Sequence, residues 1–293
     1  MTSHDVTNRI RRALRAAFPA PRRRHGHKVG HTGTLDPGAT GVLVVCLGRT
    51  TRLVPFLQAG RKTYEARMQL GRTTTTLDAE GDVTAEHDAS HIDEQTVCEA
   101  LKRFVGPIEQ IPPMVSAVKV DGERLHARAR RGEVIEREPR PVVIHDLVLE
   151  DFVAGAFPEV GFLVSCSAGT YVRTLADDVG AVLGVGGHLV ALRRLASGGA
   201  RISQAVPLST LEAAIADGDL ERLLMRPAAA MAQADYPTVV IDDTAVTQLS
   251  YGRPIAATGH DGPVAAVDAA GRLIAVVSDQ DGRARPRLVL APA

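Results

Sequence analysis

A glycine-rich stretch that holds one carboxylate constrains this chain most. Residues 28–41 read Lys-Val-Gly-His-Thr-Gly-Thr-Leu-Asp-Pro-Gly-Ala-Thr-Gly and lead directly into an apolar run, residues 42–47. The glycines allow unusual backbone angles and close approach of a ligand, and Pro37 pushes Asp36 towards an extended conformation. A carboxylate on a stiff turn beside a strand is well placed for chemistry. The alternative is a tight turn in which Asp36 bonds only its own backbone.

Length and composition predict a globular protein. At 293 residues, of which 45% are hydrophobic and 23% charged, the chain suits one large domain and a small one. No apolar run reaches the roughly 18 residues of a membrane helix, and the basic N-terminus lacks the apolar core of a signal peptide. We therefore expect a cytoplasmic protein that binds no membrane.

The sequence predicts neither a metal site nor a bound cofactor. Its three cysteines, Cys46, Cys98 and Cys166, form no Cys-x-x-Cys pair and lie in apolar or helical patterns, which is typical of buried free thiols. The glycine-rich stretch lacks the Gly-Lys-Ser/Thr ending of a nucleotide-binding loop. A phosphate-binding enzyme that uses this stretch as an anion cradle is therefore a less favoured alternative.

Charge is unevenly distributed along a chain whose net charge is zero. Residues 1–28 carry eight Lys and Arg against one Asp, whereas residues 77–99 are acidic. A basic face on a neutral protein is a footprint for nucleic-acid phosphates, and solvated surface is the alternative. Residues 20–28 form a basic loop, which is either solvated or an added phosphate-contacting arm.

Periodicity predicts helices and strands in alternation, followed by short strands at the end of the chain. Helical spacing of apolar residues marks residues 6–18, 90–105 and 208–224. Strand patterns mark residues 42–47, 62–71, 140–144 and 162–166. Residues 227–237 are rich in Ala and are expected to be a linker. The short strands from Pro237 onward, separated by Asp-Gly and Ala-Gly turns, predict a compact β-barrel.

The string from His31 to Leu43, His-Thr-Gly-Thr-Leu-Asp-Pro-Gly-Ala-Thr-Gly-Val-Leu, resembles the catalytic motif of the TruB family of tRNA pseudouridine synthases. In that family the Asp of the motif is the catalytic residue, which implies this role for Asp36. It would act as a nucleophile or as the base that removes a sugar proton. His31 would occupy or support the space left by a flipped base, and a turn residue with a satisfied ring is the alternative.

A second match lies in residues 62–64, Lys-Thr-Tyr, which resemble the family's Lys-x-Tyr strand. The Tyr of that strand lies against the target base, which implies that Tyr64 stacks on the base and helps to move its C5 proton. A core tyrosine with a satisfied hydroxyl is the alternative.

The third match is residues 169–173, Gly-Thr-Tyr-Val-Arg, which resemble the family's Gly-Thr-Tyr-x-Arg motif between a strand and a helix. Thr170 is the expected N-cap of that helix. The resemblance implies that Arg173 pairs with Asp36 and keeps it ionised and oriented. A structural ion pair between Arg173 and Asp177, one turn on, is the alternative.

Shorter matches imply the remaining substrate contacts. Residues 110–119 resemble the family's Gln-x-Pro-Pro-x-x-Ser-Ala-x-Lys segment, and Lys119 would face a phosphate path. Tyr171 and Leu192 would line the pocket, with Leu192 against the uracil. Position 126 is His where the family commonly has Tyr, so no role is predicted for it.

The resemblance implies an α+β pseudouridine synthase fold, with a mixed, mainly antiparallel sheet flanked by helices. The catalytic domain would cover residues 1–230, and a PUA-like β-barrel that binds RNA would cover residues 237–293. The barrel carries arginines that would contact the acceptor stem: Arg253, Arg272, Arg283, Arg285 and Arg287. Family members usually have a short strand and an Asp-Lys-Pro-x-Gly turn before the words Thr-Ser-His-Asp-Val, and we expect this strand to be missing here.

The implied activity is isomerisation of uridine-55 in the T-arm of tRNA to pseudouridine. The base is flipped out, the C1′–N1 bond is cleaved, and C5 is joined to C1′. We expect a monomer that binds tRNA and needs no cofactor. A non-catalytic tRNA-binding or RNA-folding module is the alternative, but it gives no reason for Asp36, Tyr64 and Arg173 to occur together. We predict that these three residues meet in one cleft.

Overall fold

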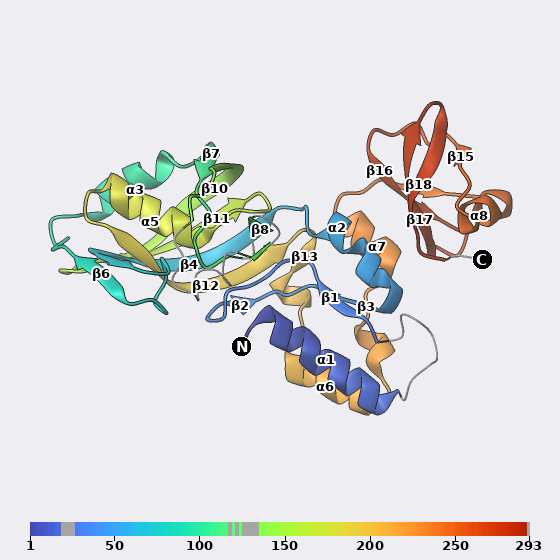
Figure 1. Ribbon diagram of the computed structural model, residues 1–293, viewed down its shortest axis with the longest axis horizontal. Helices are drawn as coiled ribbons and strands as arrows, with labels where there is room; N and C mark the ends of the chain where they lie inside the picture. Colours follow the sequence, from blue (N-terminus) through green and yellow to red (C-terminus); the bar gives the residue numbers. More distant parts are fainter. Residues whose placement is uncertain (19–26, 117–118, 121–122, 125–134, 292–293) are drawn as a thin grey trace. The chain divides into compact units, whose positions relative to one another are not determined.

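The computed structural model of the chain describes residues 1–18, 27–116, 119–120, 123–124 and 135–291 (Figure 1). One compact unit consists of Met1–Pro37, Val42–Gly60 and Ser197–Ala293, and the other of Gly38–Gly41 and Arg61–Ala196. The expectations for most of the basic loop 20–28 and for His126 lie outside the described residues. No helix of the described part is long and apolar enough to span a membrane.

The first unit begins with α1 (Ser3–Ala17), which packs against α6 (Leu208–Ala216). Thr2 caps α1 in a capping box with Asp5, so the helix starts before the predicted residue 6. The apolar faces of the two helices form a core with the following members: Ile10, Leu14, Val29, Ile215 and Leu220. Burial of this core fixes α1 as a rigid element.

After α1 in the sequence, β1 (Val29–His31) pairs with β3 (Val45–Leu47) in antiparallel orientation. The run 42–47, predicted as one strand, is a strand only at Val45–Leu47. Its first residues instead connect β3 to β2 (Thr40–Gly41), which pairs in a different sheet. A 3₁₀ helix η1 (Gly48–Leu53) and α2 (Val54–Leu57) follow.

The C-terminal part of the first unit contains a sheet in the order β14-β16-β17-β18-β15. Its strands are β14 (Thr238–Val240), β15 (Ile255–Ala256), β16 (Pro263–Val267), β17 (Leu273–Gln280) and β18 (Arg283–Val289). β14 is parallel to β16, and the other pairs are antiparallel. The sheet and α8 (Asp243–Ser250) bury a shared apolar core, consistent with the predicted PUA-like module.

The prediction of a linker at residues 227–237 is wrong for the first seven residues. Residues Pro227–Gln233 form the helix α7, because alanines favour helix and Pro227 suits a first turn. Met231 of α7 is fully buried against Leu57 and Val276 in one apolar cluster. Three short elements complete the unit: β13 (Ala200–Arg201), η2 (Ile202–Gln204) and η3 (Leu220–Leu223).

The second unit is built on a sheet in the order β12-β4-β11-β10-β7, with β2 beside β12. Its strands are β4 (Lys62–Leu70), β7 (Gly106–Gln110), β10 (Arg140–Val153), β11 (Glu159–Cys166) and β12 (Gly187–Ser197). The strand β11 is antiparallel to both β4 and β10, and β2 is parallel to β12. The mixed, mainly antiparallel α+β fold is therefore confirmed.

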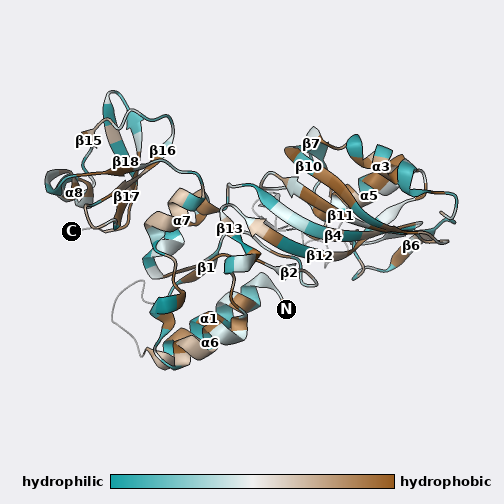
Figure 2. Ribbon diagram, turned by 180° about the vertical axis from the view of Figure 1, so that it is seen from behind, coloured by the Kyte–Doolittle hydropathy of each residue, from teal (hydrophilic) through white to brown (hydrophobic). Residues whose placement is uncertain are grey.

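Two helices, α3 (Glu94–Lys102) and α5 (Val172–Val182), lie on one face of this sheet (Figure 1). In Figure 2, hydrophobic residues occur along β10 and β11. This agrees with the complete burial of Ile144, Phe162 and Val164 in these strands. Two small hairpins complete the unit: β5 (Arg72–Thr74) with β6 (Val83–Glu86), and β8 (Lys119–Val120) with β9 (Glu123–Arg124).

Candidate active site

The loop that carries Asp36 starts from β1 in the first unit. The Thr32 N–H donates to the Val44 carbonyl at 3.1 Å and so extends the pairing of β1 with β3 into the loop. The Gly33 N–H donates to Nδ1 of His31 at 3.3 Å, which leaves Nε2 to carry the proton of a neutral ring. Asp36 follows as a partly exposed residue.

The four residues after Pro37, Gly38–Gly41, belong to the second unit, where Gly41 pairs with its sheet. Gly41 pairs with Arg194 of β12 and has a φ of +99°. A Cβ at this position would lie 2.2 Å from the Arg194 carbonyl oxygen, so only glycine fits. The glycine therefore sets how closely β2 approaches β12.

Two buried cations lie in the same sheet, and one of them, Lys62, is the first residue of the Lys-Thr-Tyr match. Lys62 opens β4 and is 7% exposed, and Arg194 on the neighbouring β12 is 1% exposed. Burial and the nearby charge of Arg194 lower the pKa of Lys62. Tyr64 is also buried, and because it lies two residues after Lys62 it shares a face of β4 with it. Across the ladder, Lys62 faces Cys166, whose pKa burial raises.

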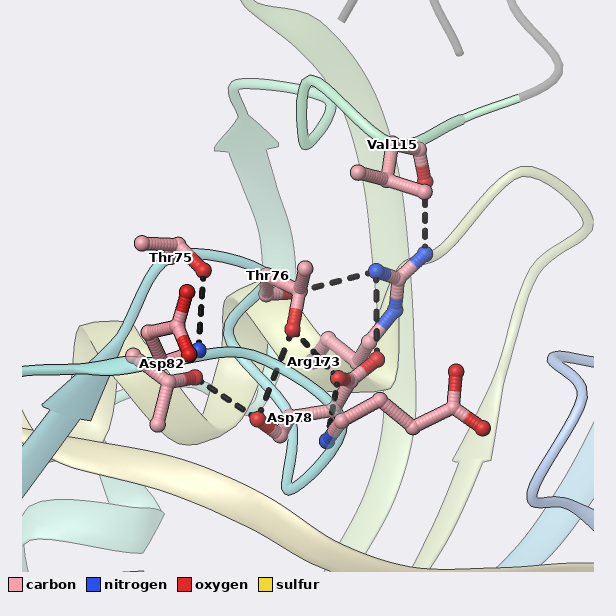
Figure 3. A network of polar contacts seen from close by, with 8 residues as sticks. Thr75, Thr76, Asp78, Asp82, Val115 and Arg173 are labelled. Carbon is pink, nitrogen blue, oxygen red and sulfur yellow. Dashed lines mark hydrogen bonds and ion pairs between the residues drawn. The ribbon is translucent and has the colours of Figure 1, made fainter. Parts of the chain in front are cut away.

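Arg173, in the first turn of α5, is held by a buried polar network (Figure 3). One terminal nitrogen, Nη1, donates to the Thr76 carbonyl at 3.0 Å and lies 3.4 Å from Asp78 Oδ2. The other, Nη2, donates to the Val115 carbonyl at 2.9 Å. The guanidinium therefore has a fixed orientation, because its side chain is only 4% exposed and is held from two sides.

Asp78 is in turn fixed by the turn that carries it. Its Oδ1 accepts from the Thr76 hydroxyl at 2.5 Å and from the Glu80 N–H at 3.1 Å. Gly81 closes the turn, and a Cβ there would lie 2.4 Å from Thr76 Oγ1. This arrangement holds a carboxylate beside Arg173 with a single geometry.

Two main-chain hydrogen bonds attach the same turn to the sheet. The Ala79 N–H donates to the Leu189 carbonyl at 2.9 Å, and the Leu189 N–H donates to the Leu77 carbonyl at 3.0 Å. Asp78 forms an isolated bridge with Leu189 between these two bonds. The pairing with β12 therefore fixes the position of the Asp78 main chain relative to the sheet.

The buried side-chain amide of Gln110 fixes the start of α5. Gln110, at the end of β7, is 1% exposed and bonds both main-chain polar groups of Tyr171. Tyr171 is the N-cap residue of α5, and its own side chain makes no capping hydrogen bond. The prediction that Thr170 is this cap is wrong, because the Thr170 hydroxyl donates to the Ser167 carbonyl within the preceding turn.

The predicted site residues are distributed over the two compact units. His31 and Asp36 belong to the first unit, and five others belong to the second: Tyr64, Lys119, Tyr171, Arg173 and Leu192. Leu192 is half-buried on β12, and Lys119 lies on β8, opposite Arg124. Asp36 belongs to one unit, and Tyr64 and Arg173 to the other. The expectation that the three residues lie in one cleft therefore stays a prediction.

The alternative partner proposed for Arg173, Asp177, is not supported. Burial raises the pKa of Asp177, which is opposite to the effect of a bound guanidinium. The carboxylate found beside Arg173 is Asp78, far away in the sequence. Its position two residues after the threonine run 73–76 and three residues before Gly81 is the local signal that indicates a structured carboxylate turn.

Family models match nearly all of the chain. The N-terminal domain model of TruB family pseudouridylate synthases matches residues 22–172. The chain belongs to the TruB family. A C-terminal domain model of tRNA pseudouridylate synthase B matches residues 173–231, and a C-terminal model of tRNA pseudouridine synthase II matches residues 236–291. The family predicted from the motifs is therefore confirmed.

Relatives of this TruB chain are similar over its full length. A tRNA pseudouridine synthase B of Thermobifida fusca is 42% identical, over 99% of this chain and 94% of its own. The protein of the same name from Burkholderia mallei is 45% identical over 100% and 94%. Among solved structures, a Cbf5-Nop10-Gar1 complex aligns with a TM-score of 0.74 at 27% identity, covering 100% of this chain and 82% of that one.

Proposed function

We propose that this protein isomerises a uridine of tRNA to pseudouridine, and that the uridine is number 55 of the T-arm. The observation that carries the proposal is the match of TruB family models to residues 22–172, 173–231 and 236–291. Relatives at 42–48% identity bear the name tRNA pseudouridine synthase B.

Three residues carry the chemistry in this proposal. Asp36 reacts with the ribose, either as a nucleophile at C1′ or as the base that removes a sugar proton. Arg173 pairs with Asp36 and keeps it ionised, and Tyr64 lies against the uracil. The rigid setting of Arg173 supports this role, because a guanidinium held by Asp78 and two carbonyls keeps its orientation when a second carboxylate binds.

The base must leave the RNA stack before it can be turned. His31 fills the space that it leaves, Tyr171 and Leu192 line the pocket, and Lys119 contacts a phosphate. The C1′–N1 bond then breaks, the uracil turns, and C5 joins C1′ as its proton is lost to N1 or solvent. The substrate supplies every atom of the product, so the reaction consumes no co-substrate.

The domain assignment is part of the proposal. Residues 1–230 form the catalytic domain, and residues 237–293 form the PUA-like domain that contacts the acceptor stem. Arg283, Arg285 and Arg287 support this contact, since they alternate along β18 and are all exposed. We propose that the protein acts as a cytoplasmic monomer.

The deciding experiment compares the wild type with Asp36→Asn on unmodified tRNA. Carbodiimide-dependent primer arrest reports pseudouridine at position 55, and filter binding reports tRNA affinity. We expect Asp36→Asn to abolish the arrest while affinity stays within about twofold, because phosphate contacts elsewhere hold the RNA. Asp82→Asn, in an exposed loop position, is the matched control and should stay active.

Two outcomes would contradict the proposal. Turnover by Asp36→Asn near that of the wild type would mean that another residue carries the chemistry. A wild type that binds tRNA and leaves every uridine unchanged would favour the non-catalytic binding module.

A further inference from the structure

A single hydroxyl in α1 bonds both main-chain polar groups of the residue before Asp36. The Leu35 N–H donates to Oγ of Ser3 at 2.8 Å, and the Ser3 hydroxyl donates to the Leu35 carbonyl at 3.2 Å. A serine hydroxyl has one proton and two lone pairs, so it fills both roles at once. Ser3 is 5% exposed, which shields the two bonds from water.

The helix that carries Ser3 is itself held firmly. The capping box of Thr2 and Asp5 fixes its first turn, and Arg9 makes an ion pair with Glu212 of α6 at 2.6 Å. Ile10 is buried in the core that α1 shares with α6. The hydroxyl of Ser3 is therefore a fixed point of the first unit, to which residue 35 is attached.

The backbone on the other side of Asp36 is fixed as well. Pro37 has a locked φ and restricts Asp36 to extended conformations. With Leu35 held by Ser3, the direction of the Asp36 side chain is defined from both sides. Ser3 itself has no group that the isomerisation needs.

We propose that Ser3 is a positioning residue, which aims the Asp36 carboxylate by holding both main-chain polar groups of Leu35. This inference rests on the proposed role of Asp36. Small displacements of a reacting group are costly: misplacement by about 1 Å lowers the rate by about a hundredfold. Loss of the Ser3 hydroxyl should therefore act on the chemical step and leave RNA binding intact.

The test compares Ser3→Ala with Thr7→Val. Thr7 is a matched control, because its hydroxyl is also buried in α1, at 3% exposed, but donates only to the His4 carbonyl in its own helix. We expect Ser3→Ala to lower kcat by about tenfold to a hundredfold, with KM for tRNA within about twofold. Thr7→Val should keep the wild-type kcat.

Hydrogen exchange of residues 33–38 provides a readout that does not depend on activity. The Leu35 amide should exchange about tenfold faster in Ser3→Ala, as expected for the loss of one or two hydrogen bonds, and at the wild-type rate in Thr7→Val. A merely structural role in α1 would lower the melting temperature of both variants and slow both enzymes alike.

Three results would overturn the inference. These are a kcat of Ser3→Ala within about twofold of the wild type, an unchanged exchange rate at Leu35, or equal losses of kcat in the two variants. In each of them the wild type is active. A wild type that forms no pseudouridine would instead refute the proposed function, and the inference with it.

Discussion

Gln110 holds Tyr171 by both polar atoms of its main chain. The side-chain oxygen of Gln110 accepts from the Tyr171 N–H at 3.0 Å, and its amide nitrogen donates to the Tyr171 carbonyl at 3.2 Å. Tyr171 is the N-cap of α5 and lies two residues before Arg173. The last residue of β7 therefore fixes the start of the helix that carries the candidate guanidinium.

Substitution of Gln110 by Met should destabilise the protein strongly. The variant keeps the side-chain volume but removes both hydrogen bonds between Gln110 and Tyr171, although the Tyr171 carbonyl still accepts from the Leu175 N–H. We expect a loss of about 1–3 kcal/mol in the free energy of unfolding. Urea unfolding measures this loss. Gln95→Met, on the exposed side of α3, should change stability by less than about 0.5 kcal/mol. Similar losses in both variants would argue against the clamp.

Asp78→Asn should impair catalysis while leaving tRNA affinity unchanged. The substitution removes the charge beside Arg173, which then loses its fixed orientation, and we expect kcat to fall by about tenfold to a hundredfold. Single-turnover primer-arrest assays measure the rate. Asp82→Asn serves as the control, since the two bonds between Asp82 and Thr75 use the Asp82 main chain: its N–H donates to the Thr75 hydroxyl, and its carbonyl accepts from the Thr75 N–H. A fully active Asp78→Asn variant would refute the positioning role.

Gly41→Ala should disrupt the docking of β2 on β12. The new Cβ would clash with the Arg194 main chain at a backbone angle that alanine rarely adopts, so we expect a loss of at least about 2 kcal/mol in stability and of most activity. Gly38→Ala is the matched control in the same segment. Its Cβ would meet only Glu80 Oε1 at 3.6 Å, an ordinary contact. Equal melting temperatures of the two variants in thermal unfolding would contradict the prediction.

Asp178→Asn should stabilise the protein at neutral pH. Burial, and then the charge of Asp177, raise the pKa of Asp178 from 3.8 to about 6. Because the folded state binds this proton more tightly than the unfolded state, the group lowers stability as the pH rises from about 4 to about 6. After a discount for partial exposure, we expect a gain of about 1 kcal/mol at pH 7.5 and none near pH 4.

The control for this pH dependence is Asp261→Asn, in an exposed loop of the C-terminal sheet. It should change stability by less than about 0.5 kcal/mol at either pH. A gain for Asp178→Asn that persists unchanged at pH 4 would mean that ionisation of the carboxyl is not its cause.

Local patterns were sufficient to predict much of the fold. Alternation of apolar residues predicted β4 within one residue of its observed end. The segment 227–233 was missed, because alanines suit a linker and a helix alike until Met231 is seen to be buried. The split of residues 42–47 depends on pairing with distant strands, which periodicity does not report.

The candidate site shows the same limit. Motifs led to Asp36, Tyr64 and Arg173, because these residues carry the chemistry of the family. Gln110 lies in a matched segment, but the motifs did not predict that Ser3, Gln110 or Asp78 supports the site, since each holds a residue 32 to 95 positions away. Such long-range contacts form only in the folded chain, and a single sequence leaves them unmarked.

The attachment of the Asp78 turn to β12 has a consequence for protein engineering. Main-chain atoms of Leu77, Ala79 and Leu189 make the two hydrogen bonds of this attachment, so these bonds do not require particular side chains at the three positions. Ala79 is exposed, and Leu77 already adopts a left-handed conformation that Asn or Gly would accept more readily. Position 79 can therefore be diversified freely, and position 77 with Asn and Gly, to screen for altered RNA preference while the main-chain bonds to Leu189 are kept.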